Sequence, residues 1–114
     1  MESILNSIKK LLGIADDYDC FDMDIVIQIN TAFSVLTQIG VGPKNGFQIE
    51  DANAIWTDFI EDDPRLGMVK TYVYLKVKLA FDPPTSSSVL DSYKSTIQEY
   101  EWRLQVATDP PVTV

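Results

Sequence analysis

Apolar residues recur at helical spacing in five stretches of this chain. The helices that this spacing predicts span residues 3–12, 22–39, a short piece within 52–60, 65–81 and 89–106. Gly13, the run 40–43 and the run 82–84 are stop signals for the first, second and fourth of them. Asp51 and Asp63 precede the third and fourth as candidate helix caps. The pattern predicts an all-α fold, a small bundle of four to five helices.

The predicted helix 65–81 carries more apolar surface than one core needs. One stripe along it comprises Leu66, Val69, Val73, Val77 and Ala80. A second stripe, well round the cylinder from the first, comprises Met68, Tyr72, Leu75 and Leu79, with Lys76 isolated between the two. A helix that is apolar around most of its circumference is central to a core or is shared between a core and an interface. We therefore expect the second stripe to contact a neighbouring subunit.

The predicted helix 89–106 carries a single seam. Its apolar positions alternate spacings of three and four, which is typical of helix–helix packing: Leu90, Tyr93, Ile97, Tyr100 and Leu104. Trp102 lies well off this seam. It either belongs to a partner surface or covers an edge of the core.

The last six residues, 109–114, cannot be helical at their two prolines and end in Val112, Thr113 and Val114. These β-branched residues could add to the edge of a partner's sheet, and a frayed terminus explains them equally well. We expect one helical domain over residues 1–108 and an extended arm over 109–114, with the three terminal residues as its contact.

Composition narrows the function classes. The chain has 114 residues, enough for one domain, and a net charge of −8, which disfavours free binding to nucleic acid. Its apolar runs are too short for a membrane span, and an acidic residue, Glu2, stands where a signal peptide would be basic. We expect a cytosolic protein with no membrane partner.

The sequence offers little material for catalysis. It has no histidine, and its single cysteine, Cys20, lies among aspartates that disfavour a thiolate. Carboxylate pairs such as Asp58 with Glu61, or Asp62 with Asp63, are explained equally well as surface acids at a helix end. We expect no enzymatic activity and no cofactor.

The acidic run 16–24 invites comparison with a calcium loop. Asp17 and Asp19 stand at the right interval, but Phe21 occupies the position of a third ligand and no glycine turn follows. Solvated loop acids and helix-start acids, with Asp22 and Asp24 near a helix N-terminus, account for the run better. We expect no metal site.

Several segments resemble the head–tail connector proteins of long-tailed bacteriophages. They are the residues 24–30 (DIVIQIN), 38–43 (QIGVGP), 69–79 (VKTYVYLKVKL), 81–87 (FDPPTSS) and 99–104 (EYEWRL). The resemblance runs from residue 4 to residue 104 and rests on the residues themselves, since these proteins have no catalytic signature.

The resemblance implies a small helical bundle that joins as a ring, dodecameric like the portal, at the vertex of the filled capsid. Such an adaptor forms the first section, beneath the portal, of the channel through which DNA leaves, and a stopper or tail-completion protein docks below it. The C-terminal segment of such proteins reaches toward the portal. The protein would be in the host cytoplasm during assembly and then in the virion at the head–tail junction.

A negatively charged wall suits a DNA conduit, because a wall that bound phosphate would retain the genome. The candidate channel acids are Asp16, Asp17, Asp19, Glu61, Asp62 and Asp63. The same charge suggests an alternative, an inhibitor that mimics DNA and occupies a basic groove on a host protein. True mimics carry carboxylates in dense rows, whereas the 17 acids here are split between loop clusters and scattered helix positions.

Overall fold

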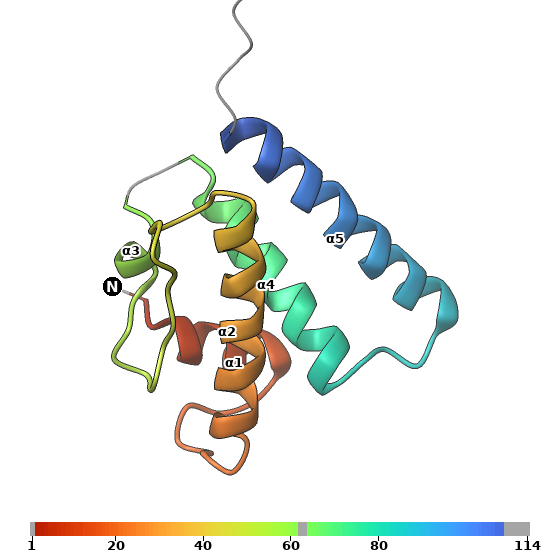
Figure 1. Cartoon of the computed structure of the whole chain (residues 1–114). Coiled ribbons are helices and arrows are strands. Elements are labelled where there is room, and N and C mark those ends of the chain that lie inside the picture. Colours follow the sequence, from red (N-terminus) through yellow and green to blue (C-terminus); the bar gives the residue numbers. More distant parts are fainter. Residues whose placement is uncertain (1, 62–63, 109–114) are drawn as a thin grey trace, which may run out of the picture.

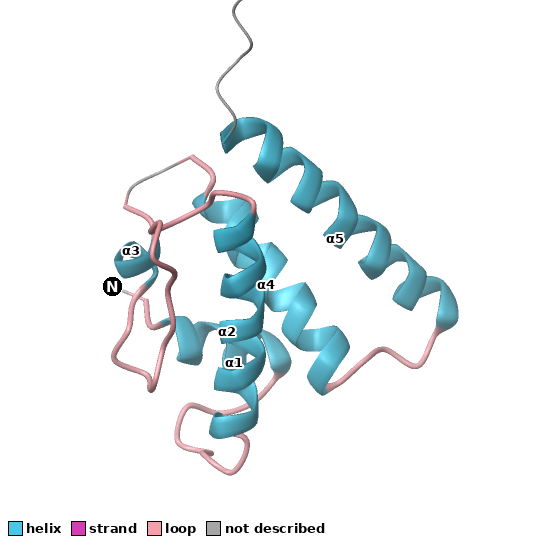
Figure 2. Cartoon of the chain, in the orientation of Figure 1, coloured by secondary structure: helices cyan, strands magenta, loops and turns pink. Residues whose placement is uncertain are grey.

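The computed structural model describes residues 2–61 and 64–108, and within these ranges the regular structure is helical, without strands. Its five helices are α1 (Ile4–Leu12), α2 (Asp22–Gln38), α3 (Trp56–Phe59), α4 (Leu66–Phe81) and α5 (Ser87–Thr108). Figure 2 shows them joined by irregular loops. The predicted all-α bundle is confirmed, and the expected arm 109–114 lies outside the described residues.

The centre of the bundle is the pair α2 and α4. These two helices make the most extensive contact in the fold, α1 packs against both, and α5 packs chiefly along α4 (Figure 1). One face of α2 is buried, including Ile25, Ile29 and Phe33, and it meets Val69 and Val73 of the first α4 stripe in one apolar cluster. Burial of these faces is the main force that holds the short helices together.

The helix ends follow local chemistry. The Ser3 hydroxyl accepts a hydrogen bond from the Asn6 backbone N–H at 3.2 Å and caps α1, which ends at Gly13 in the left-handed region as predicted. The Ser86 carbonyl accepts from the backbone N–H of Leu90 at 3.0 Å, so α5 begins two residues earlier than its apolar pattern indicated.

The third helix is shorter than predicted. The Asp51 carboxylate accepts a hydrogen bond from the Asn53 backbone N–H at 2.8 Å, so Asp51 closes a local turn rather than capping a helix. The single turn of α3 is capped from within, because Asp58 accepts from the Ile55 backbone N–H at 2.9 Å. Asp58 therefore has a structural role as the cap of this short helix.

An extended segment between α2 and α3 is fastened to α2 by one side chain. The Ile49 backbone N–H donates to Asn30 Oδ1 at 2.8 Å, and Asn30 Nδ2 donates to the Ile49 carbonyl at 3.0 Å. Asn30 thus supplies both hydrogen bonds that a neighbouring strand would have supplied.

Aromatic rings fill the space between this segment and α2. The rings of Phe33 and Phe59 have centroids 4.5 Å apart, those of Phe33 and Phe47 are 5.1 Å apart, and Trp56 Nε1 donates to the Ser7 hydroxyl at 2.9 Å. Trp56 and Phe59 are both buried and anchor this part of the core.

Candidate interaction surfaces

The second stripe of α4 is largely covered by the chain's own α5. Tyr72 and Leu75 are buried, and the Tyr72 hydroxyl donates to Glu101 Oε2 on α5 at 2.6 Å. Burial first, and then this hydrogen bond, raises the pKa of the Tyr72 hydroxyl. Tyr72 and Leu75 therefore have no exposed surface left for the subunit contact that we expected them to make. It stays a prediction for Met68 and Leu79, which are half-buried.

The outer side of α5 is open. Trp102 is 64% exposed, and Val106, one turn further along the helix, is 53% exposed. Because α5 packs chiefly against α4, its far side meets none of the other helices extensively. A tryptophan held out from the core in this way is typical of a partner surface, so the structure leaves Trp102 available for the role that the sequence suggested.

A groove runs between α2, α4 and α5. It encloses about 470 Å³ and is lined by Gln28, Thr31, Lys76, Leu79, Ala80, Lys94, Ile97, Gln98 and Glu101. Its apolar lining comes from Leu79, Ala80 and Ile97, and two ammonium groups, Lys76 and Lys94, stand beside it. Neither lysine has a hydrogen bond or ion pair to another of the described residues. The sequence pattern singled out Lys76 but gave no sign of the groove, because a groove requires the relative placement of three helices.

The exposed acids of the loop between α1 and α2 are anchored by a buried lysine. Lys9 is fully buried, and its Nζ lies 2.8 Å from Asp22 Oδ1 and donates to the Asp16 carbonyl at 3.0 Å. The burial of Lys9 was not predicted from the sequence. A signal was present, because Lys9 lies one helical turn after the buried Leu5 on the apolar face of α1.

The candidate channel acids are split between places. Asp16, Asp17 and Asp19 are exposed in the loop that precedes α2, and Glu61 is exposed after α3. Figure 1 shows that the first loop lies where α2 begins and that α4 begins near the other end of α2, so these described acids do not form one continuous surface. Asp62 and Asp63 lie outside the described residues, as do Val112, Thr113 and Val114.

A second exposed apolar surface surrounds the start of α2. Met23 is 77% exposed and Ile27 is 53% exposed, so both lie off the buried face of the helix. Phe21 bridges from this surface to the end of α4, with its ring centroid 5.3 Å from that of Phe81, and the Tyr18 ring follows at 5.7 Å from Phe21. Exposed apolar side chains gathered in this way mark an interaction site.

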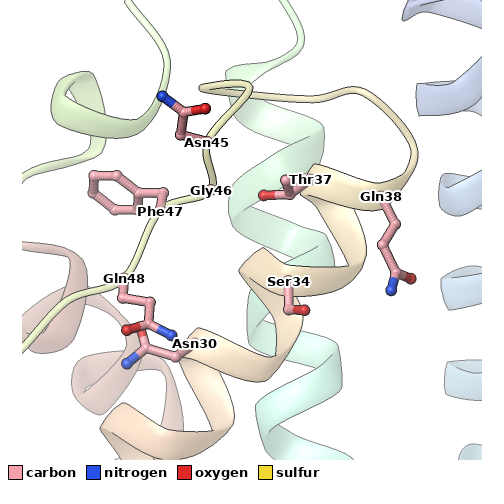
Figure 3. A pocket seen from close by; sticks show the side chains of 8 residues that line it. All are labelled: Asn30, Ser34, Thr37, Gln38, Asn45, Gly46, Phe47 and Gln48. Carbon is pink, nitrogen blue, oxygen red and sulfur yellow. The ribbon is translucent and has the colours of Figure 1, made fainter.

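A polar notch lies on another side of α2. It encloses about 440 Å³ and is lined by Asn30, Ser34, Thr37, Gln38, Asn45, Gly46, Phe47 and Gln48 (Figure 3). Amides and hydroxyls dominate its lining, and none of the eight side chains can exchange a proton near neutral pH. The Asn30 amide is already engaged with Ile49, so the notch offers no catalytic arrangement.

Over residues 2–61 and 64–108, no group of three or more metal-ligating side chains comes together. In the same part of the chain, no helix is both long enough and apolar enough to cross a membrane.

Comparison with known protein families indicates which of these surfaces are candidates for function. The family model for the phage connector protein matches residues 4–111. The chain belongs to the phage connector protein family. No curated protein and no solved structure matches it.

Membership of the connector family confirms the resemblance noted in the sequence. The chain is a structural protein of the head–tail connector, in a family that is not enzymatic. The family implies contacts with the portal and other virion proteins at the head–tail junction. The exposed apolar surfaces, rather than the polar notch, are therefore the candidate functional features of this connector.

Proposed function

We propose that this connector is an adaptor that forms a ring beneath the portal, encloses part of the DNA channel and docks a stopper or tail-completion protein below. One observation carries the proposal beyond the family. The chain exposes large apolar side chains on two separate surfaces, Trp102 with Val106 on α5 and Met23 with Ile27 on α2. A subunit of a closed ring needs two different contact surfaces, one for each neighbour.

The charge of the chain supports a conduit. At a net charge of −8, a ring of such subunits repels phosphate, so DNA passes without specific binding. Asp16, Asp17 and Asp19 are exposed and are the described acids we propose for the channel wall, with Glu61 as a further candidate. The ring is proposed to be dodecameric, to match the portal, and to assemble in the host cytoplasm before it becomes part of the virion.

We further propose that residues 109–114 are the arm that reaches the portal. Their contact residues would be Val112, Thr113 and Val114, whose β-branched side chains suit addition to a sheet edge. The helical domain 1–108 would then form the body of the ring.

The test is assembly with purified portal, followed by size-exclusion chromatography with light scattering and by negative-stain imaging. We expect a ring of this chain on the portal. A monomer in isolation is compatible with the proposal, because a ring can require the portal as its template. A chain that stays monomeric and binds neither portal nor capsid would contradict it.

Two variants test the surfaces. Trp102→Ala and truncation after Thr108 should leave the circular dichroism spectrum unchanged and weaken assembly on the portal. Gln105→Ala, another exposed α5 side chain, is the matched control and should assemble normally. Normal assembly by both test variants would show that the ring uses other surfaces.

A further inference from the structure

We propose that the groove between α2, α4 and α5 receives the exposed start of α2 from a neighbouring copy of this chain. This inference rests on the proposed ring and refines its surfaces. The start of α2 stays one contact surface, while the groove takes the place of the Trp102 and Val106 surface as the other, which leaves Trp102 for contact with the portal or another virion protein. We call the inserted part the acidic knob, and it comprises Asp19, Phe21, Met23 and Asp24. In this pairing Asp19 faces the neighbouring subunit, so Asp16 and Asp17 are the loop acids that remain for the channel wall.

The groove has the chemistry of a receptor for an acidic, apolar segment. Leu79 and Ile97 give it an apolar lining, while Lys76 and Lys94 bring two positive charges that no described residue neutralises. Glu101, the one carboxylate in the lining, already accepts the Tyr72 hydroxyl. Lys10 and Lys44 likewise form no ion pair with a described residue, but neither lines the groove, so Lys76 and Lys94 are distinguished by their place beside its apolar lining.

The acidic knob has the complementary chemistry. Met23 is the most exposed of the large apolar side chains in the described part of the chain, at 77%. Asp19 and Asp24 flank it, both exposed and neither in an ion pair with another described residue. An apolar side chain between two carboxylates matches an apolar lining beside two ammonium groups, and such complementarity gives specificity and register to an interface.

The placement of the two surfaces favours a second copy as the occupant. The Phe21 and Asp24 side of the knob adjoins the groove, since Gln28 and Ala80 line both the groove and the hollow beside Phe21 and Asp24. Asp19 and Met23 border a separate hollow together with Leu5 and Ala52. The Met23 end of the knob therefore cannot enter its own groove while α2 stays in place. A contact between two different surfaces is heterologous, and repeated with a constant rotation it closes a ring.

The knob is also held ready for insertion. The buried ion pair between Lys9 and Asp22, together with the bond from Lys9 to the Asp16 carbonyl, fixes the loop against α1. A tilted contact between the rings of Tyr18 and Phe21 and an edge-to-face contact between those of Phe21 and Phe81 brace its other side. A surface that is ordered before binding loses less conformational entropy when it binds.

Reciprocal charge reversal tests the pairing. One variant carries Lys76→Glu and Lys94→Glu in the groove, and the other carries Asp19→Lys and Asp24→Lys on the knob. Each alone should lose self-association by more than about tenfold, because like charges then face each other. An equimolar mixture should restore it, since a normal knob meets a normal groove and a reversed knob meets a reversed groove. Light scattering and sedimentation over a concentration series give the association constants.

A matched control separates pairing from net charge. Lys10→Glu with Lys44→Glu changes the net charge from −8 to −12, the same change as the groove variant, at exposed lysines outside the groove. This control should retain association within about threefold of the unmodified chain, and all variants should retain the circular dichroism spectrum.

The pairing would be overturned by no restoration in the mixture, by an equal loss in the control, or by an unmodified chain that does not self-associate up to about millimolar concentration or on portal. Truncation after Thr108, which is expected to weaken assembly on the portal, should leave self-association without portal intact. If truncation abolishes it while charge reversal has no effect, the C-terminal segment is the occupant instead. Variants that form normal rings on portal would overturn the pairing but leave the proposed function standing.

Discussion

At the scale of a single residue, Gly42 fixes the turn that follows α2 in the sequence. Its φ is +87°, and a Cβ added to it would clash with the Phe59 ring. Gly42→Ala should therefore lower the free energy of unfolding by about 2 to 4 kcal/mol, through backbone strain and overpacking together. Gly46→Ala, at φ +92° with open space around the added carbon, should cost only about 1 kcal/mol. Urea denaturation measures both, and equal losses would show that Phe59 moves aside freely.

Lys9 is unusual because its side chain is fully buried, whereas a lysine side chain is normally solvated. Lys9→Met keeps the side-chain volume but removes the ammonium from Asp22 and from the Asp16 carbonyl. We expect a loss of about 1 to 3 kcal/mol in the free energy of unfolding. This loss is smaller than that from breaking a fully buried ion pair, because Asp22 is one-third exposed. Lys10→Met, on the exposed side of α1, should change stability by less than about 0.5 kcal/mol. An equally small effect at Lys9 would mean that the ammonium contributes nothing to the loop.

Tyr72 should make the fold sensitive to alkali. Burial raises the pKa of its hydroxyl in the folded chain, whereas the unfolded chain releases the proton near the ordinary pKa of about 10. Above that pH the unfolded state binds fewer protons than the folded state, so the free energy of unfolding falls as pH rises. The contribution is fully present below about pH 10 and is lost above it.

Tyr72→Phe should cost about 1 kcal/mol near neutral pH, through the lost hydrogen bond to Glu101. Its unfolding free energy should then fall less between about pH 9 and pH 11 than that of the unmodified chain. Tyr74, whose pKa burial also raises, contributes to both proteins alike. Parallel profiles from urea denaturation would contradict the assigned role of Tyr72.

At the scale of elements, α5 is the least supported of the long helices. It packs chiefly against α4, whereas α4 itself is held by α1, α2 and α5. We expect amide hydrogen exchange to show α5 opening separately, with protection factors lower than those of α2 and α4 by about tenfold or more. Ile97→Ala, at a buried position, should widen this difference, while Val106→Ala, at an exposed one, should not. Uniform protection across all helices would show that the fold opens as one unit.

Periodicity predicted the long helices because each buries one face whose spacing is visible in the sequence. It overextended α3, because Asp51 can close a turn as readily as it can cap a helix. It also assigned Tyr72 and Leu75 to a neighbouring subunit. A stripe of apolar residues shows that something covers it, but not whether the cover is another subunit or the chain's own α5.

At the scale of the whole molecule, the net charge and the family membership support the proposed role as part of a DNA channel. The isolated chain should show no gel shift with duplex DNA between about 50 and 200 mM salt, since its net charge of −8 repels the phosphate backbone. Binding that weakens steeply with salt would contradict the proposed conduit. An affinity that appears only in the assembled ring would place basic groups on the channel wall.

Only part of the candidate interaction surfaces could be predicted from the sequence. Trp102 was identified from its place off the α5 seam, and the loop acids from their grouping in the sequence. The groove with Lys76 and Lys94 was not, because it exists only once α2, α4 and α5 are placed together. The buried Lys9 was missed because a lysine on a short helix is normally solvated.

The burial of Lys9 has a consequence for the fidelity of assembly. The loop that carries the knob is tied to α1 through one ammonium group, so its shape depends on α1 being seated on α2 and α4. A newly made or damaged subunit whose N-terminal helix is not yet in place would lack a competent knob. If the knob docks as proposed, incompletely folded subunits would be rejected at the growing edge of the ring, without a separate chaperone to sort them.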